Sequence, residues 1–140
     1  MSHDRAWIES HLPHKGAMCL LDEIIEWDES RVRALARRHR SPDHPLRSRG
    51  ALPAVCAIEY GAQAAAAHGA LCSSQPSGAG FLAGVRGVTL NARRLDDIAS
   101  DLRIDAEQLG ASAAGVLYSF TVTGDGRVLV AGRLTVAFER

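Results

Sequence analysis

The sequence predicts an α+β fold in which a curved antiparallel sheet wraps around one long central helix. Residues 51–71, ALPAVCAIEYGAQAAAAHGAL, form a nearly all-apolar stretch of helical length. Two candidate strands precede this stretch and four follow it. A helix that is apolar on nearly all sides must be surrounded rather than covered on one face, and a curling sheet does this. The chain of 140 residues is long enough for one such domain, over residues 1–140.

Before the central helix, the sequence predicts one short helix and two strands. The short helix is expected over residues 5–11. The segment 18–27, MCLLDEIIEW, is rich enough in β-forming residues for a strand. Apolar residues alternate with arginines in RVRALARRH (31–39), as in a half-buried strand. Two prolines and a glycine in residues 40–52 predict an ordered loop.

The central helix is expected to start near Pro53, because a proline loses nothing at the first helical turn. We expect it to reach about Leu71 and to be followed by the turn-rich residues 73–80, SSQPSGAG. The four later strands are predicted over 80–93, 100–108, 113–123 and 127–138. The GDG sequence at 124–126 predicts a hairpin between the last two strands.

Composition excludes some classes of function. The formal net charge is zero, which argues against a general nucleic-acid binder, because such proteins need a basic field. Cys19, Cys56 and Cys72 lack metal-ligand spacing and suit small core residues in a reducing compartment. No metal site is predicted.

The N-terminal residues, MSHDRAWIESHL, lack the basic and apolar pattern of a signal peptide. The apolar helix is interrupted by Glu59, Gln63 and His68, which favours a buried helix over a membrane span. We therefore expect a cytoplasmic protein.

Glu59 is the ionisable residue that the helix places among apolar neighbours. Glu59 and Gln63 are four residues apart and share one helix face, whereas His68 is turned to roughly the opposite side. One interpretation is structural, with the carboxyl bonded to backbone or to an arginine. The other is functional: Glu59 faces a cleft, and burial raises its pKa into a range useful for proton transfer.

The start of the helix offers further groups for catalysis. Backbone N–H groups of Ala54 and Val55 are expected to be free at the positive end of the helix dipole, where they can polarise a carbonyl oxygen. His44 lies in the preceding loop. A base, two donors and an acid can thus converge on one substrate.

Three motifs resemble those of hot-dog-fold 3-hydroxyacyl-acyl-carrier-protein dehydratases. PAVCAIEYGAQAAA (53–66) resembles the central-helix motif, LPHKGAMCLLDEI (12–24) the N-terminal motif, and GFLAGVRGVTLNARRL (80–95) the strand after the helix. The string LPA...IEYGAQAAAAH is most similar to the branch associated with aryl-polyene pigment clusters. Together the motifs span most of the chain.

The resemblance implies a hot-dog fold and an active site shared between two subunits. His44 and Glu59 of the facing subunit would be catalytic, and the carbonyl would be polarised by Ala54 and Val55. Gln63 and His14 complete the expected substrate-binding set: Ala54, Val55, Gln63 and His14. The His44 segment, DHPLRSRG, differs from the family's Gly-His-Phe-Pro-Gly, and Ala54 replaces a glycine. For His14 an anchoring role and an active-site role are both open.

The implied reaction is the dehydration of a 3-hydroxyacyl thioester on an acyl carrier protein. His44 would take the α-proton, and a protonated Glu59 would assist departure of the hydroxyl as water. Elimination of water is redox-neutral, so no cofactor is expected. The family usually forms dimers or larger assemblies. Two alternatives remain: a non-catalytic hot-dog subunit that supports an active partner, and a hot-dog thioesterase.

Arginines are concentrated in residues 31–49. They suit either a solvated strand face neutralised by nearby acids or a docking patch for an acidic carrier protein that includes Arg38 and Arg40. Of the other histidines, His39 is expected to be solvated and His68 to be satisfied within the fold.

Overall fold

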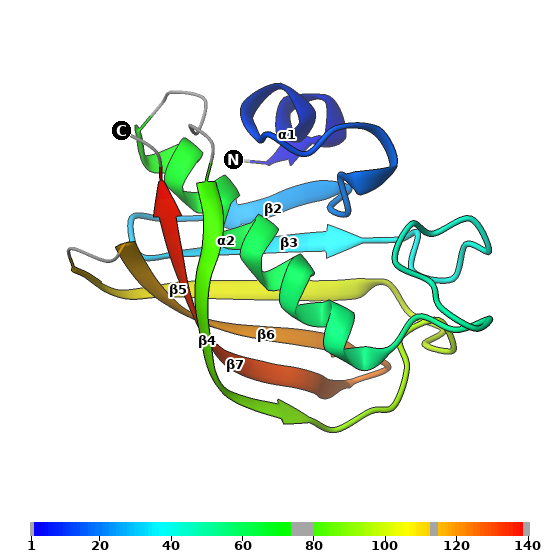
Figure 1. Cartoon of the computed structure of the whole chain (residues 1–140). Helices are drawn as coiled ribbons and strands as arrows, with labels where there is room; N and C mark the ends of the chain where they lie inside the picture. Colours follow the sequence, from blue (N-terminus) through cyan, green and yellow to red (C-terminus); the bar gives the residue numbers. More distant parts are fainter. Residues whose placement is uncertain (1, 74–79, 113–114, 139–140) are drawn as a thin grey trace.

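The computed structural model describes residues 2–73, 80–112 and 115–138 and confirms the predicted α+β class (Figure 1). Its elements are β1 (His3–Asp4), α1 (Arg5–His11), a 3₁₀ turn (Gly16–Met18), β2 (Glu23–Trp27), β3 (Arg31–Ala36), a second 3₁₀ turn (Ala54–Cys56), α2 (Ala57–Ser73), β4 (Gly80–Leu90), β5 (Leu102–Ser112), β6 (Gly115–Gly124) and β7 (Arg127–Phe138). Within these ranges the strands form one antiparallel sheet in the order β1-β2-β3-β5-β6-β7-β4. Most of the turn expected over 73–80 lies outside the described residues.

Helix α2 lies across the concave face of the sheet, as Figure 1 shows. Pro53 has φ −59° and precedes the 3₁₀ turn that leads into α2, so the predicted start is confirmed. The helix packs closely on β6: a Cβ atom added at Gly61 would lie 2.7 Å from Cδ2 of Phe120. Gly61 therefore sets the distance between the helix and the sheet.

The strands follow the alternation seen in the sequence. Val32, Ala34 and Ala36 of β3 are buried towards α2, and Arg31 is exposed on the other face. The predicted hairpin is confirmed between β6 and β7, where Asp125 and Gly126 both have positive φ, 51° and 74°. Two central residues with positive φ match the twist of antiparallel strands.

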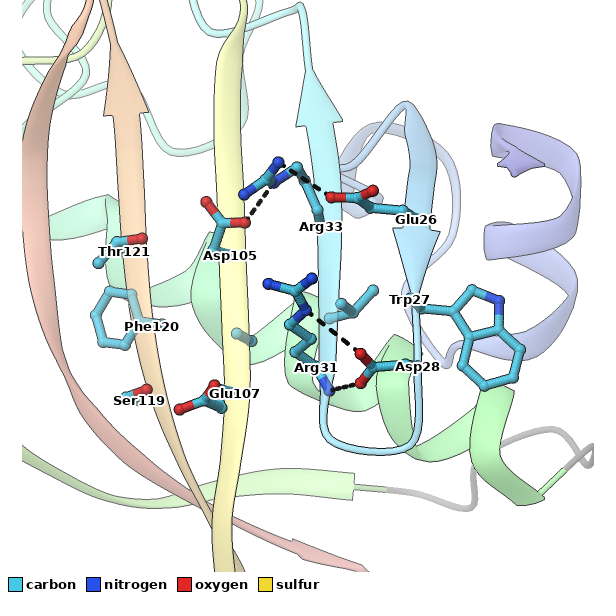
Figure 2. Close-up of a pocket in the computed structure, with 12 residues that line it drawn as sticks. Glu26, Trp27, Asp28, Arg31, Arg33, Asp105, Glu107, Ser119, Phe120 and Thr121 are labelled. Carbon is cyan, nitrogen blue, oxygen red and sulfur yellow. Dashed lines mark hydrogen bonds and ion pairs between the residues drawn. The ribbon is translucent and has the colours of Figure 1, made fainter. Parts of the chain in front are cut away.

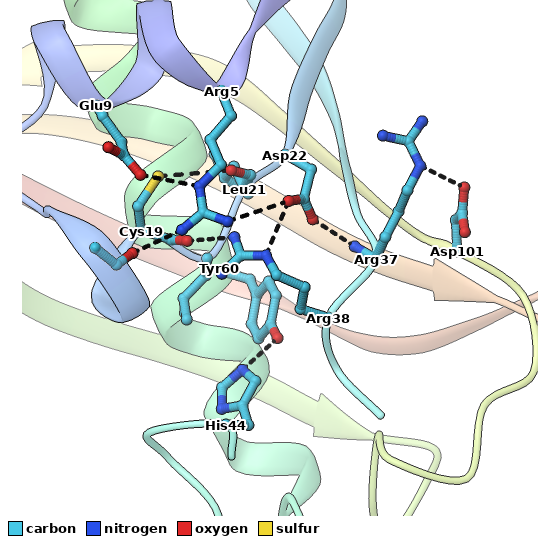
Figure 3. Close-up of polar contacts among 12 residues, drawn as sticks. Arg5, Glu9, Cys19, Leu21, Asp22, Arg37, Arg38, His44, Tyr60 and Asp101 are labelled. Atoms are coloured by element: carbon cyan, nitrogen blue, oxygen red, sulfur yellow. Dashed lines mark hydrogen bonds and ion pairs between the residues drawn. The ribbon is translucent and has the colours of Figure 1, made fainter. Parts of the chain in front are cut away.

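Figure 3 shows that acids of the same chain neutralise part of the arginine-rich stretch. The ion pairs are Arg31–Asp28, Arg33–Glu26, Arg33–Asp105, Arg37–Glu23, Arg37–Asp101, Arg38–Asp22 and Arg47–Asp96. Arg38 also donates to the carbonyl of Cys19. The structure therefore favours the neutralised strand face over a docking patch built on Arg38.

Asp96 ties down the loop that enters the central helix. Its carboxylate accepts a 2.9 Å hydrogen bond from the backbone N–H of Leu52 and pairs with Arg94 and Arg47. The side chain is only 4% exposed, and the Arg94 guanidinium holds its pKa well below the ordinary value. This anchor fixes the position of Pro53, and with it the start of the helix.

Candidate active site

A pocket of about 230 Å³ lies beside the exposed face of α2. Its lining residues are Pro13, His14, Glu59, Ala62, Ala66, Leu82 and Val136. Positions 59, 62 and 66 follow helical spacing, so these side chains share one face of α2. Pro13 and His14 come from the segment after α1. The pocket thus joins the Leu-Pro-His motif to the glutamate of the central helix.

His14 and Glu59 are the titratable pair in this pocket. Nε2 of His14 lies 3.5 Å from Oε1 of Glu59, and the side chains are 27% and 34% exposed. Nδ1 of His14 is buried and has no hydrogen-bond partner among the described residues. Because Nδ1 is enclosed, a substrate in the pocket meets the imidazole at Nε2, next to the carboxylate.

The expectation of a raised pKa at Glu59 is wrong in direction. The hydrogen bond from His14 lowers the pKa of Glu59, and the amide of Gln63 adds to this, whereas partial burial acts in the opposite sense. Hydrogen bonds to the charged form outweigh desolvation because the side chain is still a third exposed. Glu59 is therefore an ionised carboxylate at neutral pH.

Gln63 connects the helix to the His14 segment. Its Oε1 accepts a 2.9 Å bond from the N–H of Leu20, and its Nε2 donates a 2.8 Å bond to the carbonyl of Met18. The residue is fully buried. The structure therefore gives Gln63 a positioning role in this chain, in place of the expected contact with substrate.

His44 lies in the core rather than in the pocket (Figure 3). Its Nε2 is 2.8 Å from the Tyr60 hydroxyl, and its Nδ1 accepts a 3.1 Å bond from the N–H of Leu46. This bond assigns the proton to Nε2, which then donates to Tyr60. Burial and the nearby cation of Arg38 lower the pKa of His44. Within this chain the structure brings Glu59 together with His14 and keeps His44 apart.

The two expected carbonyl-binding amides differ from each other. The N–H of Ala54 donates to the carbonyl of Arg93 at 3.1 Å and is therefore not free. The cause is a local backbone pairing, in which Pro53 forms a β-bridge with Arg94. Val55 is 50% exposed and lies in the first turn, where backbone donors lack intrahelical acceptors. Val55 therefore remains the candidate for the expected carbonyl-binding role, whereas the N–H of Ala54 is already occupied.

A basic cleft of about 660 Å³ lies beside the start of the helix. It is lined by Ala51, Pro53, Ala92, Arg93, Arg94, Asp97 and Arg127. Arg94 is paired with Asp96. Among the described residues, Arg93 and Arg127 form no ion pair, although Arg127 donates to the carbonyl of Asn91 and acts on Asp125 electrostatically. Asp97 also lines the cleft, which therefore keeps a small excess of positive charge beside the first helical turn.

A third groove, of about 310 Å³, lies on the outer face of the sheet (Figure 2). Arg33 bridges Glu26 and Asp105 there, and Arg31 pairs with Asp28. Both arginines are therefore paired with acids, Glu107 adds a further carboxylate, and the lining residues include no histidine. The groove offers no acid–base pair comparable with His14 and Glu59.

Two further histidines, His39 and His68, are buried inside the fold. Nδ1 of His68 is 2.8 Å from the hydroxyl of Tyr118, and Nε2 lies 3.0 Å from the carbonyl of Asp28, as expected for a satisfied residue. His39 was expected to be solvated, and this is wrong. It is 1% exposed and its Nε2 bonds to the carbonyl of Ile98, because the loop after β3 folds back against residues 95–98.

Four pocket residues, Pro13, Ala66, Leu82 and Val136, are not among the site residues expected from the sequence. The role of His14 was undecided, although its Leu-Pro-His motif was the available signal. Ala66 was not selected, although its spacing of seven residues from Glu59 places it on the same helix face.

Comparisons with known proteins identify a matching family and structures that share the fold. A family model described as "ApeP-like: ApeP dehydratase" matches residues 6–139. A chain of "The Dehydratase Heterocomplex ApeI:P from Xenorhabdus doucetiae" is 26% identical, with a TM-score of 0.81, over 95% of this chain and 91% of that one. No curated protein shows significant sequence similarity.

More distant structures share the fold alone. The virulence protein Cj0977 from Campylobacter jejuni is 12% identical, with a TM-score of 0.65, over 96% of this chain and 89% of that one. A mutant of thioesterase PA1618 from Pseudomonas aeruginosa is 18% identical, with a TM-score of 0.54, over 81% of this chain and 78% of that one.

Within the described ranges, every helix is too short or too polar to cross a membrane.

Proposed function

The chain belongs to the ApeP-like dehydratase family, and from this premise we propose that it removes water from 3-hydroxyacyl thioesters carried by an acyl carrier protein, in aryl-polyene biosynthesis. The observation that carries the proposal is the pair formed by His14 and Glu59, 3.5 Å apart in a pocket with apolar walls. The pair can take one proton and give another at neighbouring positions of a bound substrate.

The lowered pKa of Glu59 assigns the two roles. The Glu59 carboxylate takes the α-proton while the N–H of Val55 polarises the thioester carbonyl. Nε2 of His14, 3.5 Å from that carboxylate, gives a proton to the departing hydroxyl, which leaves as water. The proton on Glu59 then passes to His14 and restores the pair. The resemblance instead implies His44 as the base and Glu59 as the acid; here Glu59 is the base, because it is ionised before the reaction, and His14 is the acid.

A second hot-dog subunit is proposed to cover the open side of the pocket. The relative from Xenorhabdus doucetiae is described as part of a dehydratase heterocomplex. In this chain, β4 is an edge strand of the sheet, and its Leu82 and Val85 are 36% and 39% exposed. Val55 of the neighbouring helix turn is 50% exposed. An exposed apolar edge suits pairing with another chain, either a second copy or a different subunit.

The decisive experiment measures product formation from a 3-hydroxyacyl carrier protein. The chain is assayed alone and mixed with a candidate second hot-dog subunit, and mass spectrometry follows loss of water. We expect an enoyl thioester that remains attached to the carrier. Release of free carrier thiol would instead indicate a thioesterase. Activity of the complex that survives in Glu59→Gln would indicate a non-catalytic supporting role.

The carrier protein is proposed to dock at the basic cleft. Arg93 and Arg127 line this cleft beside Pro53, at the helix end where the thioester would be bound. We expect the double variant Arg93→Glu, Arg127→Glu to raise KM for the carrier-bound substrate about tenfold at low salt, with kcat unchanged. Steady-state kinetics at two salt concentrations measure the effect.

Arg40→Glu is the matched control, because Arg40 is exposed but lies outside the cleft. It should leave KM unchanged. If Arg40→Glu raised KM and the double variant did not, docking would be assigned to the loop after β3 instead.

A further inference from the structure

The pocket continues beyond the acid–base pair along α2. Ala62 and Ala66 line it one and two turns after Glu59, and Leu82 and Val136 line it from the sheet. At 1.5 Å per residue, Ala66 lies about 10 Å along the helix axis from Glu59. The pocket therefore has a reactive end at His14 and Glu59 and an apolar end at Ala66.

The small residues of α2 do not all serve this pocket. Gly61 is required for close packing on Phe120, and Ala65 is fully buried in the core. Ala62 and Ala66 are the small helix residues that contact the pocket. A larger side chain at either position would project into the space where we expect the acyl chain.

We propose that Ala66 limits the length of the acyl chain that the pocket accepts, while Ala62 keeps the pocket open nearer the reacting carbons. This inference rests on the proposed function, which places the reacting carbons beside Glu59. An extended chain advances about 1.2 Å per bond, so about eight bonds separate the reacting carbons from Ala66. Counted from the reacting carbons, a butyryl chain ends well before Ala66, an octanoyl chain ends about two bonds short of it, and a dodecanoyl chain passes it.

The test measures binding with unreactive ligands. Butyryl-, octanoyl- and dodecanoyl-pantetheine amides are titrated calorimetrically into the full chain, alone and in complex with its partner subunit. We expect Ala66→Leu to weaken dodecanoyl binding about tenfold or more and to leave butyryl binding unchanged. Ala62→Leu should weaken all three. Ala66→Val should act like Ala66→Leu with a smaller effect, and it replaces Ala66→Leu if thermal unfolding shows that variant to be misfolded.

Ala99→Leu is the matched control, since Ala99 is exposed and outside the pocket. The proposal is overturned if the Ala66 variants weaken all chain lengths equally or none, or if no amide binds the wild-type chain or its complex. If the Ala66 variants change the preferred chain length but no hydroxyacyl substrate is dehydrated, the length limit stands and the proposed dehydration is rejected. If substrates are dehydrated but the preferred chain length is unchanged, dehydration stands and the length limit is rejected.

Discussion

Glu59→Gln is expected to lower kcat for dehydration by about two to four orders of magnitude, with a small change in KM. Glutamine keeps the size of the side chain but cannot take the α-proton. His14→Asn should lower kcat by a similar factor, because the hydroxyl would then leave without a proton donor. The double variant should be little worse than either single variant, since the two residues act as a unit. Single-turnover dehydration on a carrier-bound substrate measures all three.

His44→Ala separates this assignment from the one based on family resemblance. In this chain His44 bonds to the buried Tyr60 hydroxyl, so its removal should reduce stability and leave kcat within a few-fold. If His44→Ala lost as much activity as Glu59→Gln while His14→Asn did not, the catalytic histidine would be His44 of a facing subunit.

The same pair predicts a pH dependence. The hydrogen bond from His14 lowers the pKa of Glu59. The carboxylate therefore stays ionised at pH values where an ordinary glutamate is already protonated. Activity should therefore be kept until the pH falls through this lowered pKa. In His14→Asn the main cause of the lowering is removed, so the pKa of Glu59 should rise. NMR titration of the carboxyl carbon measures this without any need for turnover.

Gln63→Leu is expected to reduce the free energy of unfolding by about 2–3 kcal/mol. Leucine fills a similar volume but leaves the N–H of Leu20 and the carbonyl of Met18 without the partners that Gln63 provides. Activity should fall as well, because the segment that carries His14 loses its connection to the helix. Urea unfolding monitored by circular dichroism gives the stability change.

Gln108→Leu provides the control, because Gln108 is an exposed residue on β5. It should change the free energy of unfolding by less than about 0.5 kcal/mol. Equal stability of the two leucine variants would show that the amide of Gln63 does not hold the His14 segment.

Much of the fold could be predicted because its signals are local. Helix α1 has the predicted bounds, 5–11, and β7 has the predicted bounds, 127–138. The DG turn of the last hairpin follows from which residues tolerate positive φ. The curved sheet was predicted because a helix that is apolar on nearly all sides must be surrounded. The first turn of the central helix is 3₁₀ and its end is Ser73 rather than Leu71, since helix ends depend on neighbouring contacts.

Of the candidate site, the sequence identifies one residue, and the others depend on the tertiary structure. Glu59 is identifiable from the sequence, because a carboxylate in an apolar helix needs an explanation wherever the helix packs. The choice between His14 and His44 belongs to the tertiary structure. It depends on Gln63, which binds Met18 and Leu20 across more than forty positions of sequence.

The pKa of Glu59 was likewise decided by contacts between distant segments. Residue type and helical periodicity predict burial, and burial alone raises the pKa of a carboxyl group. In the folded chain the direction is the opposite, because the imidazole of His14 and the amide of Gln63 stabilise the ionised form. Periodicity along one segment thus identifies an element and its buried face. Which side chains of different segments meet, and which protonation state they stabilise, depends on distances that only the folded chain defines.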